Sequence, residues 1–582
     1  MDVQQLRGSK LPSPRFRIAP LAEPLRHVHG FTDLQTFFPT LTKLYRLNKH
    51  QSETVWLDSK WRITGLDISG TSGPCRLDLV ENTDISGGVS KNSAPRRPAF
   101  LKVTHLLDPI RWIKGSYSLP RHTGLPWHTK TWAAASTKLQ DPWNQAYVET
   151  LASYALGRLR EAGISPHFNE FYGAFCARAD LYRYNLTEEF GSFRNARWFW
   201  QGRKKGLFSL CVMNGINPTE PVLQDIVDEF MREPEEGEYT SDSSDEESEE
   251  EEIHIDVEGG ELASIHSDKM SDISYASSSS GEEEGEEEGE EEGEEEGEGE
   301  EEEDEEEDYR IYAELRDFPV MLIAVEENRG TMDDLLGNEA EVGASMDTPQ
   351  WEERWSAWLF QVIAALSVAQ TLLGLTHNDL HTNNVVWTET EEEYLWYRAR
   401  SGSVFRVPTF GKLFRLIDFG RAIFTINGRQ FISDDFRNGN DAEGQYYFKP
   451  LNQRCKPDEA IPPNPSFDLS RLAVSMIEGI FPEAPKEKEG GTILSSEEDM
   501  EVRETVSPLY NTLWSWLVDD DGKNILVESD GEERFPDFGL YKHIAAKVHS
   551  AIPAQQFSKA AFDQFQAPPS SAPTSGVWNL FA

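Results

Sequence analysis

Cysteine and basic residues are scarce in this 582-residue sequence. Its four cysteines lie far apart and form no Cys-x-x-Cys pair, so their spacing predicts neither a disulfide framework nor a cysteine-type zinc site. There are 55 Lys and Arg residues against 102 Asp and Glu residues, and no long window is strongly basic. We therefore expect no nucleic-acid partner.

Long apolar runs are scarce as well. The beginning of the sequence has no apolar segment of the kind that a secretion signal needs. The one stretch that approaches the length of a membrane span, residues 358–375, is interrupted by Gln361, Ser367, Gln370 and Thr371, which predicts a buried helix. We expect an intracellular protein, cytoplasmic or nuclear, with no membrane partner.

The negative charge is concentrated in one segment. Residues 234–308 hold 38 acidic residues and one basic residue, a net charge of −37, and removing it from the chain's −47 leaves −10 for the rest. Such a segment has too little apolar surface to offset a chain entropy of about 1–2 kcal/mol per residue, so we expect a disordered acidic insert over residues 234–310. It is either a solvated spacer or a segment that is phosphorylated on its serines or holds a basic protein partner.

The rest of the sequence predicts a mixed α+β fold. Short runs of β-type residues between Gly and Ser clusters over residues 56–103 indicate a small antiparallel sheet. Residues 141–163 predict a helix that Asp-Pro opens and Gly closes, and residues 168–177 predict a strand. Residues 318–326 form an apolar run of buried-strand length, and residues 349–375 predict a long helix. The buried stripe of that helix is predicted to be Trp355, Trp358, Leu359, Val362, Leu366, Ala369 and Leu373.

Three polar residues after the long helix have spacings that suit phosphoryl transfer. Asp379 lies in the loop His-Asn-Asp-Leu-His-Thr-Asn-Asn, where a carboxylate can accept the proton of an attacking hydroxyl. Asn384, five positions on, offers a carboxamide to a magnesium ion. Asp418 ends an apolar strand just before a glycine and is a second candidate magnesium ligand.

This order of motifs, HNDLHTNN at residues 377–384 and DFG at residues 418–420, resembles the protein kinase superfamily. The resemblance implies a bilobal protein kinase-like α+β fold, with a small β-rich N-lobe and a larger helical C-lobe. It implies ATP and Mg²⁺ as cofactors, Asp379 as the catalytic base, and Asn384 and Asp418 as metal ligands. Together with NPSFDL at residues 464–469, the motifs look most like the divergent serine/threonine protein kinases of large DNA viruses and their eukaryotic relatives.

The same resemblance extends to other residues. Lys102 in AFLKV matches the strand lysine that contacts the nucleotide phosphates, and Glu149 on the following helix is its natural ion-pair partner. Asp468 resembles the aspartate that braces the catalytic loop. Glu326, where a strand gives way to a turn, is a hinge candidate whose backbone would meet adenine. His377 is expected to be a packing residue of the core.

The resemblance implies an order of domains along the chain. The predicted segments are an N-terminal extension (1–55), the first part of the N-lobe (56–233), the acidic insert (234–310), the end of the N-lobe with the hinge (311–336), the C-lobe (337–565) and a C-terminal tail (566–582).

The sequence departs from the family pattern in places. No Gly-x-Gly-x-x-Gly precedes Lys102, and the glycines at 65, 70 and 73 are a loose substitute. Asn378 stands where the family has arginine in His-Arg-Asp, so activation by a phosphorylated loop bound to that arginine is not expected. No Ala-Pro-Glu motif follows the DFG.

Three alternatives stay open beside a divergent serine/threonine kinase that acts on a protein substrate. His381, two positions after Asp379, resembles the aminoglycoside and choline phosphotransferases, which implies a small-molecule acceptor. The missing glycine loop suits a pseudokinase scaffold that docks partners through the acidic insert. His377, Asp379 and His381 have side chains of types that bind zinc or iron, although a metal cluster would leave Asn384 and the DFG motif without roles.

Overall fold

The computed structural model describes most of the chain outside the acidic insert. The described residues are 16–45, 55–70, 72–82, 96–117, 133–215, 221–234, 239, 309–346, 348–448, 462–497, 500–528, 531–536 and 538–582. The predicted acidic insert falls outside these ranges except for residues 234, 239, 309 and 310, so its disorder stays a prediction.

The described residues form a mixed α+β structure, as predicted, and divide into two compact units. The first unit comprises residues 1–108, 117–180 and 317–582, and the second comprises residues 109–116 and 181–316. All six candidate site residues belong to the first unit.

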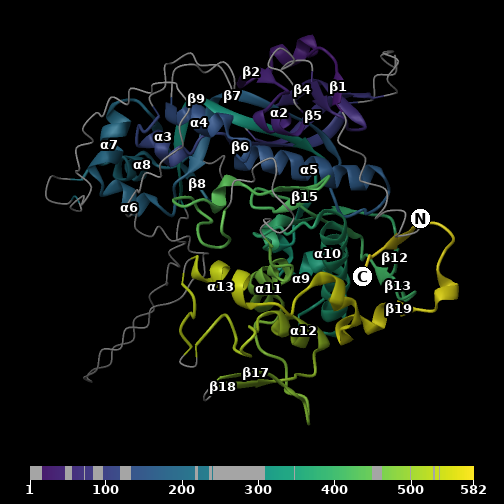
Figure 1. Ribbon diagram of the computed structural model, residues 1–582. Coiled ribbons are helices and arrows are strands. Elements are labelled where there is room, and N and C mark those ends of the chain that lie inside the picture. Colours follow the sequence, from purple (N-terminus) through teal and green to yellow (C-terminus); the bar gives the residue numbers. More distant parts are fainter. Residues whose placement is uncertain are drawn as a thin grey trace, which may run out of the picture. The chain divides into compact units, whose positions relative to one another are not determined.

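The largest sheet lies next to helix α5 in Figure 1. Six of its seven strands are β2 (Phe31–Gln35), β4 (Trp61–Ile68), β5 (Gly73–Glu81), β6 (Arg97–His105), β7 (Phe171–Asn185) and β9 (Tyr309–Val325), in the order β2-β7-β9-β6-β5-β4. The seventh, β8 (Ser209–Asn214), pairs with β9. Along β5, Cys75, Leu77 and Leu79 are buried and alternate with more exposed residues, because successive side chains point to opposite faces of a sheet. The antiparallel pairs β4–β5 and β5–β6 confirm the sheet predicted over residues 56–103, and β2 joins it from the predicted N-terminal extension.

Helix α5 (Gln145–Glu161) packs closely on this sheet. A Cβ atom on Gly157 would lie 2.8 Å from the Cβ of Phe171 on β7, so only glycine allows this approach. The helix begins later than the sequence predicts. Asn144 caps it by accepting a hydrogen bond from the Ala146 N–H at 3.1 Å, whereas Asp141 lies in the preceding turn and pairs with Arg437 at 2.5 Å.

Helix α10 (Pro349–Leu373) is the long helix that the sequence predicts. Thr348 caps its start and Gly374, with a φ of 57°, ends it in the left-handed conformation. The whole predicted stripe is buried. Within the described residues α10 alone has the length and hydropathy to cross a membrane, but 83% of its most apolar window is buried inside the protein, which confirms the predicted buried helix.

The first unit also contains a three-stranded sheet, one strand of which precedes α10, and three helices that follow α10. The sheet has the order β10-β11-β14, from β10 (Gly330–Thr331), β11 (Val385–Glu389) and β14 (Lys412–Leu416). The helices are α11 (Phe467–Ile480), α12 (Pro508–Trp516) and α13 (Gly539–Lys547). Shorter elements are β1 (Phe16–Ile18), α2 (Pro39–Tyr45), β3 (Val55–Leu57), α4 (Ala133–Gln140), α9 (Glu339–Val342), β15 (Phe424–Ile426) and β16 (Arg429–Phe431).

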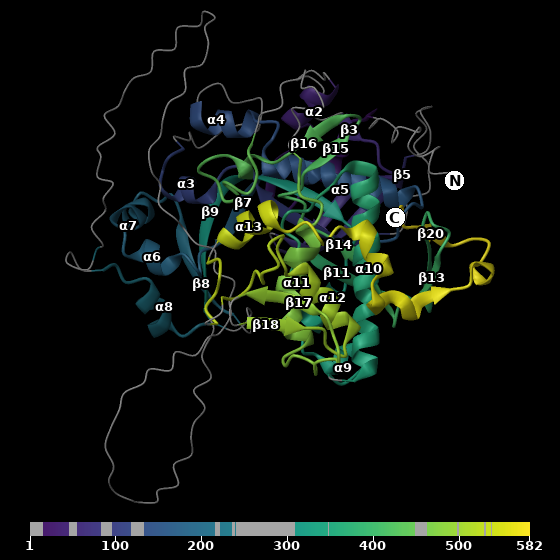
Figure 2. The ribbon, with the colours of Figure 1, turned by 60° about the horizontal axis from the view of Figure 1, so that its bottom comes forward.

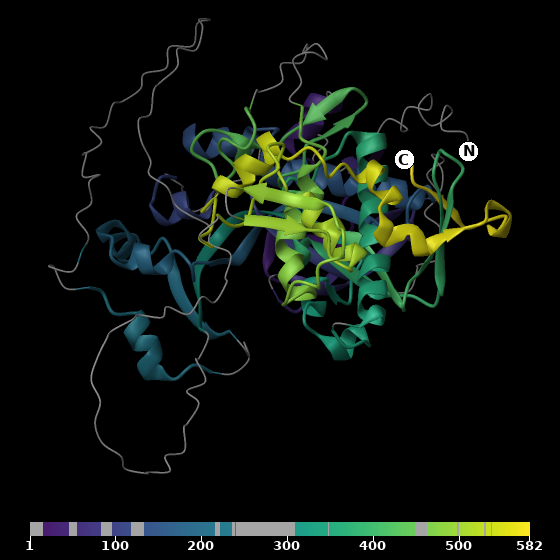
Figure 3. The same cartoon turned by 90° about the horizontal axis from the view of Figure 1, so that it is seen from below.

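The residues predicted as a C-terminal tail are part of the fold. β19 (Gln566–Ala567) and β20 (Val577–Asn579) extend the pair β12 (Tyr394–Arg398) and β13 (Val404–Pro408) into a four-stranded sheet with the order β19-β13-β12-β20 (Figure 2). Leu580 and Phe581 are buried. The hairpin of β17 (Ile493–Glu497) and β18 (Met500–Arg503), in yellow-green in Figure 3, contacts α12, where Trp514 Nε1 donates to Ser495 Oγ at 3.0 Å.

The second unit has an aromatic core of its own. It contains α3 (Pro109–Ile113), α6 (Phe190–Arg194), α7 (Arg197–Lys204), β8 (Ser209–Asn214), α8 (Gln224–Phe230) and the first part of β9, which pairs with β8. Phe199 lies at the centre of this core, with ring centroids 5.6 Å from Trp200 and 5.0 Å from Phe208. The aromatic segment around residues 198–200 therefore packs the core of this unit.

Candidate functional site

The first unit has an open cavity of about 560 Å³. Strands β6 and β9 line one side of it, and β11 and β14 line another. Its apolar wall includes Val103, Ile323, Val325, Val386 and Leu416. Four of the six predicted site residues line it as well: Lys102, Glu149, Asn384 and Asp418. A cavity with apolar walls and a few convergent polar groups is the usual form of a small-molecule site.

Lys102 forms ion pairs with two other predicted site residues, which come from segments far apart in the sequence. Its Nζ lies 2.6 Å from Glu149 Oε1 on α5 and 2.8 Å from Asp418 Oδ1, which follows β14. The Glu149 side chain is only 4% exposed, whereas that of Asp418 is 44% exposed, so Asp418 is the carboxylate that a molecule in the cavity can reach. The double pairing fixes the ammonium group of Lys102 at the polar end of the cavity.

Burial opposes ionisation of all three groups, and the ion pairs shift the pKa of each group to a different extent. At Asp418 the charge of Lys102 outweighs burial and lowers the pKa to about 2. At Glu149 burial is the stronger effect and raises the pKa to about 7, despite Lys102. Burial also opposes the charge of Lys102, yet Asp418 and Glu149 outweigh it and raise the pKa of the lysine. Near pH 7, Asp418 is therefore an anion and Lys102 a cation.

Asp468 on α11 holds the loop that carries Asp379. Its carboxylate is fully buried and accepts the backbone N–H groups of His377 at 3.0 Å and Asn378 at 2.9 Å. Asn378 has a φ of 64°, a left-handed conformation that costs most residues energy and that asparagine tolerates. The brace that the resemblance implies for Asp468 is thus present as two hydrogen bonds to the loop backbone.

His377 and Asn378 have packing and bridging roles. The buried His377 donates through Nε2 to the Ile417 carbonyl at 2.7 Å, and its ring packs on Phe419 with centroids 5.3 Å apart. Asn378 donates through Nδ2 to the Arg421 carbonyl at 3.0 Å, which ties the loop to the segment after the DFG motif. The expectation that His377 is a packing residue is confirmed.

Asn384 has its amide orientation fixed by the same loop. Nδ2 donates to the Asp379 carbonyl at 2.8 Å and lies 3.0 Å from His381 Nε2. Burial lowers the pKa of His381, which keeps Nε2 free to accept this bond. Because the amide nitrogen is engaged in this way, Oδ1 remains as an acceptor, and Asn384 lines the same cavity as the ionised Asp418. Two oxygen ligands of this kind fit Mg²⁺, which usually completes its shell with water and substrate phosphates.

The carboxylate of Asp379 is held by two residues that sequence analysis missed. Tyr541 on α13 donates its hydroxyl to Asp379 Oδ1 at 2.8 Å, and Arg421 Nη1 lies 3.5 Å from the same oxygen. Burial opposes the charge of Asp379, but Arg421 and the Tyr541 hydrogen bond outweigh it, so its pKa is lowered. Arg421 stands directly after the DFG motif, a position at which the sequence offered a signal, whereas Tyr541 lies 162 residues further along than Asp379 and offered none.

Arg421 also links this loop to the start of α5. Its guanidinium lies 3.8 Å from Asp435, which accepts a hydrogen bond from Gln145 Nε2 at 2.7 Å. The adjacent Asp434 accepts from the Gln145 backbone N–H at 2.9 Å and pairs with Lys138 at 2.6 Å. Sequence analysis gave residues 434–435 no role. They connect the helix that carries Glu149 with the segment after the DFG motif.

Glu326 and the glycine segment contribute less than predicted. The backbone N–H of Glu326 donates to the Glu170 carbonyl at 3.0 Å, and its carboxylate pairs with Arg415 at 3.0 Å. The cavity is lined instead by the neighbouring Val325, Asn328 and Arg329. From the loose glycine segment between β4 and β5, Ser72 lines the cavity, and its hydroxyl donates to the Leu101 carbonyl at 3.0 Å.

Comparisons with other proteins leave the site to be judged on its own geometry. The sequence matches no protein-family model, and no curated protein matches it. Across the residues that the structure describes, no group of three or more His, Cys, Asp or Glu side chains is arranged to hold a metal ion. His377 and His381 bond to Ile417 and Asn384 respectively, so the alternative of a zinc or iron cluster with Asp379 finds no support.

Proposed function

We propose that this chain is an ATP-dependent phosphotransferase, a divergent serine/threonine protein kinase with a bilobal protein kinase-like fold. The observation that carries the proposal is the position of Lys102, which pairs with both Glu149 and Asp418 at the polar end of the cavity. A cation fixed beside an ionised, accessible carboxylate suits a nucleotide phosphate and its counter-ion. In this proposal the antiparallel strands on one side of the cavity would belong to the N-lobe, and the helices that follow α10 would belong to the C-lobe.

Each residue has a separate task in this proposal. Lys102 binds and orients the nucleotide phosphates, and Glu149 holds Lys102 in place. Asn384 and Asp418 would hold Mg²⁺, which neutralises phosphate charge when it is bound. Asp379, with its lowered pKa, is ionised and available to accept the proton of the acceptor hydroxyl. The apolar wall would cover adenine, with backbone contacts from the segment at residues 325–329.

The acceptor class rests on the motifs. A protein serine or threonine is the acceptor that the resemblance favours. His381 suggested a small-molecule acceptor, but its bond to Asn384 gives it a role within the loop that is independent of the acceptor. The intact set Lys102, Asp379 and Asp418 argues against a scaffold without activity.

Transfer of label from γ-labelled ATP and Mg²⁺ to a mixed protein and metabolite extract tests the proposal. The wild type is compared with Asp379→Asn and with Asp225→Asn, an exposed aspartate on α8 in the second unit. We expect labelled protein with the wild type and the control, and a rate reduced by about 10²–10⁴ with Asp379→Asn. Label confined to a small molecule would replace the protein-kinase proposal. No label above the Asp379→Asn background, from folded protein, would refute phosphotransfer altogether.

A further inference from the structure

The hydroxyl of Tyr541 makes the hydrogen bond that an acceptor hydroxyl would need. It donates to Asp379 Oδ1 at 2.8 Å, and Asp379 is the proposed base. A general base must lie within about 2.6–3.2 Å of the oxygen whose proton it accepts. An external serine or threonine hydroxyl would require the same carboxylate.

Arg471 on α11 holds this hydroxyl from the other side. Its Nε donates to the Tyr541 oxygen at 2.9 Å, so the hydroxyl accepts one hydrogen bond and donates one. The guanidinium carbons of Arg471 and Arg421 lie 5.2 Å and 5.9 Å from the ring centroid of Tyr541. Two cations near the Tyr541 ring and the hydrogen bond from Arg471 therefore favour the orientation in which its hydroxyl meets Asp379.

Two aromatic rings fix the direction of the Tyr541 side chain. Phe538 stacks on it with centroids 4.8 Å apart, and Phe467 packs at 5.8 Å. The offset and tilted arrangements are favourable for aromatic pairs. They hold the ring in one position without a covalent link, so rotation of the side chain can release it.

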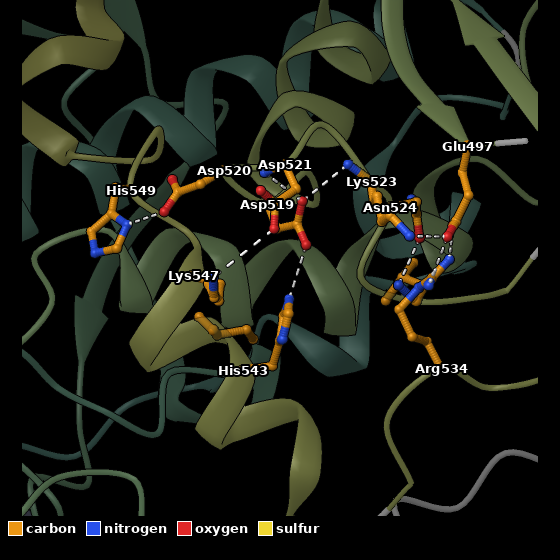
Figure 4. A network of polar contacts seen from close by, with 12 residues as sticks. Glu497, Asp519, Asp520, Asp521, Lys523, Asn524, Arg534, His543, Lys547 and His549 are labelled. Atoms are coloured by element: carbon orange, nitrogen blue, oxygen red, sulfur yellow. Dashed lines mark hydrogen bonds and ion pairs between the residues drawn. The ribbon is translucent and has the colours of Figure 1, made fainter.

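The backbone of α13 is anchored independently of Tyr541. Asn464 donates to the carbonyl groups of Ile544 and Val548 at 2.9 Å and 2.7 Å. Figure 4 shows His543 and Lys547 of this helix directed toward Asp519 and Asp521, at 3.1 Å and 3.9 Å.

The loop that carries these aspartates also holds the backbone of α13. The Asp520 N–H donates to the Lys547 carbonyl at 2.8 Å, and the Asp520 side chain pairs with His549 at 2.7 Å. Because α13 is fixed in this way, release of Asp379 requires only a movement of the Tyr541 side chain.

We propose that Tyr541 is an internal competitor for the acceptor position, whose hydroxyl must leave Asp379 before an external hydroxyl can bind there. The inference rests on the proposed phosphotransferase function and describes its regulation. A competitor within the chain lowers the fraction of protein that can bind an acceptor, and this raises the apparent KM for the acceptor. Because saturating acceptor overcomes competition, kcat is unaffected.

Steady-state kinetics of Tyr541→Phe test the inference, with a protein that the wild type phosphorylates as acceptor and ATP as donor. A hydrogen bond to a charged group is strong enough that its removal should lower the acceptor KM roughly tenfold. The KM for ATP and the kcat at saturating acceptor should stay as in the wild type. Tyr510→Phe, which removes a hydroxyl on α12 where the ring packs on Phe481 and Trp514, is the matched control.

A second variant, Tyr541→Ala, removes the ring as well and should lower the acceptor KM at least as much. Thermal unfolding of each variant verifies that it is folded. A lower kcat with an unchanged acceptor KM in Tyr541→Phe would overturn the inference, because the hydroxyl would then orient Asp379 instead of competing. In that outcome the proposed function stands. If the wild type transfers phosphate to no acceptor, both the proposed function and this inference are refuted.

Discussion

Lys102 shows how a single charged side chain is stabilised at the polar end of a cavity. Burial disfavours its ammonium group, but two carboxylates within 2.8 Å more than offset this cost. The two partners differ, since Asp418 is fully ionised at pH 7 whereas Glu149 has a pKa of about 7. Without the lysine, Glu149 can take up a proton and become neutral. Loss of Lys102 should therefore reduce stability less than it reduces activity.

Replacing Lys102 with methionine is therefore expected to abolish function before it abolishes folding. Removal of one preorganised group that stabilises developing charge costs about 10²–10³ in rate, and we expect a loss of this size in phosphoryl transfer from Lys102→Met. The measurement is the transfer rate from labelled ATP, together with thermal unfolding of the variant. Lys488→Met, at an exposed lysine, should leave the rate unchanged. An active Lys102→Met protein would contradict the role given to the lysine.

At the scale of elements, His167 fastens two strands to the segment after α5. Its ring nitrogens lie 2.8 Å from the Phe414 carbonyl on β14 and 2.8 Å from the Tyr397 hydroxyl on β12. The side chain is fully buried, and burial lowers its pKa from 6.5 to about 3. The folded protein therefore holds His167 neutral at a pH where the unfolded chain binds a proton.

The sign of the resulting pH dependence follows from that difference. Above pH 6.5 His167 is neutral in both states, and as the pH falls from 6.5 toward 3 only the unfolded state gains the proton, so stability is lost. Between pH 6.5 and 5 this loss amounts to about 1.6 kcal/mol. Denaturant unfolding at pH 6.5 and pH 5 measures this loss in the wild type and in His167→Gln. We expect the free energy of unfolding to fall more in the wild type than in the variant, and the difference between the two decreases should equal this amount. His29 is exposed, so the stability of His29→Gln should depend on pH as that of the wild type does. If the stability of His167→Gln also depends on pH as that of the wild type does, the role given to His167 is refuted.

The sequence predicts those elements that local patterns determine. The stripe from Trp355 to Leu373 has helical spacing and is buried in α10, and the short runs around Lys102 form an antiparallel sheet. Helix α5 begins three residues after Pro142 because Asn144, and not Asp141, makes the capping hydrogen bond. Both residue types are good caps, and side-chain geometry decides between them. Element boundaries of this kind depend on contacts that no local pattern encodes.

At the scale of the whole molecule, the site joins segments that are far apart in the chain. Lys102, Glu149 and Asp418 were named from motifs, and the structure brings them together within hydrogen-bonding distance. The pairing of Asp379 with Tyr541 had no comparable signal, since it depends on where α13 packs against α11. The strands β19 and β20 were missed for the same reason: short segments acquire strand structure from distant partners.

The charge distribution of the whole chain leads to a last prediction, which concerns residues 240–308. These residues carry 35 acidic side chains and one lysine, so replacing them with an uncharged Gly-Ser linker of equal length changes the net charge from −47 to −13. All the residues that line the cavity lie outside this range, so the KM for ATP should not change. A segment of such charge attracts a basic protein over distances comparable with the Debye length, about 10 Å at 0.1 M salt.

We therefore expect the linker variant to have a severalfold higher KM for a basic protein acceptor at low salt, and a weaker dependence of that KM on salt, than the wild type. An acidic protein acceptor is the control, because its KM should stay the same or fall when the repelling charge is removed. The measurement is the acceptor KM of both proteins at about 0.02 M and 0.2 M salt, conditions between which screening increases strongly. If the wild type and the linker variant have the same KM for the basic acceptor at each salt concentration, the segment is a spacer, since a spacer contributes no attraction.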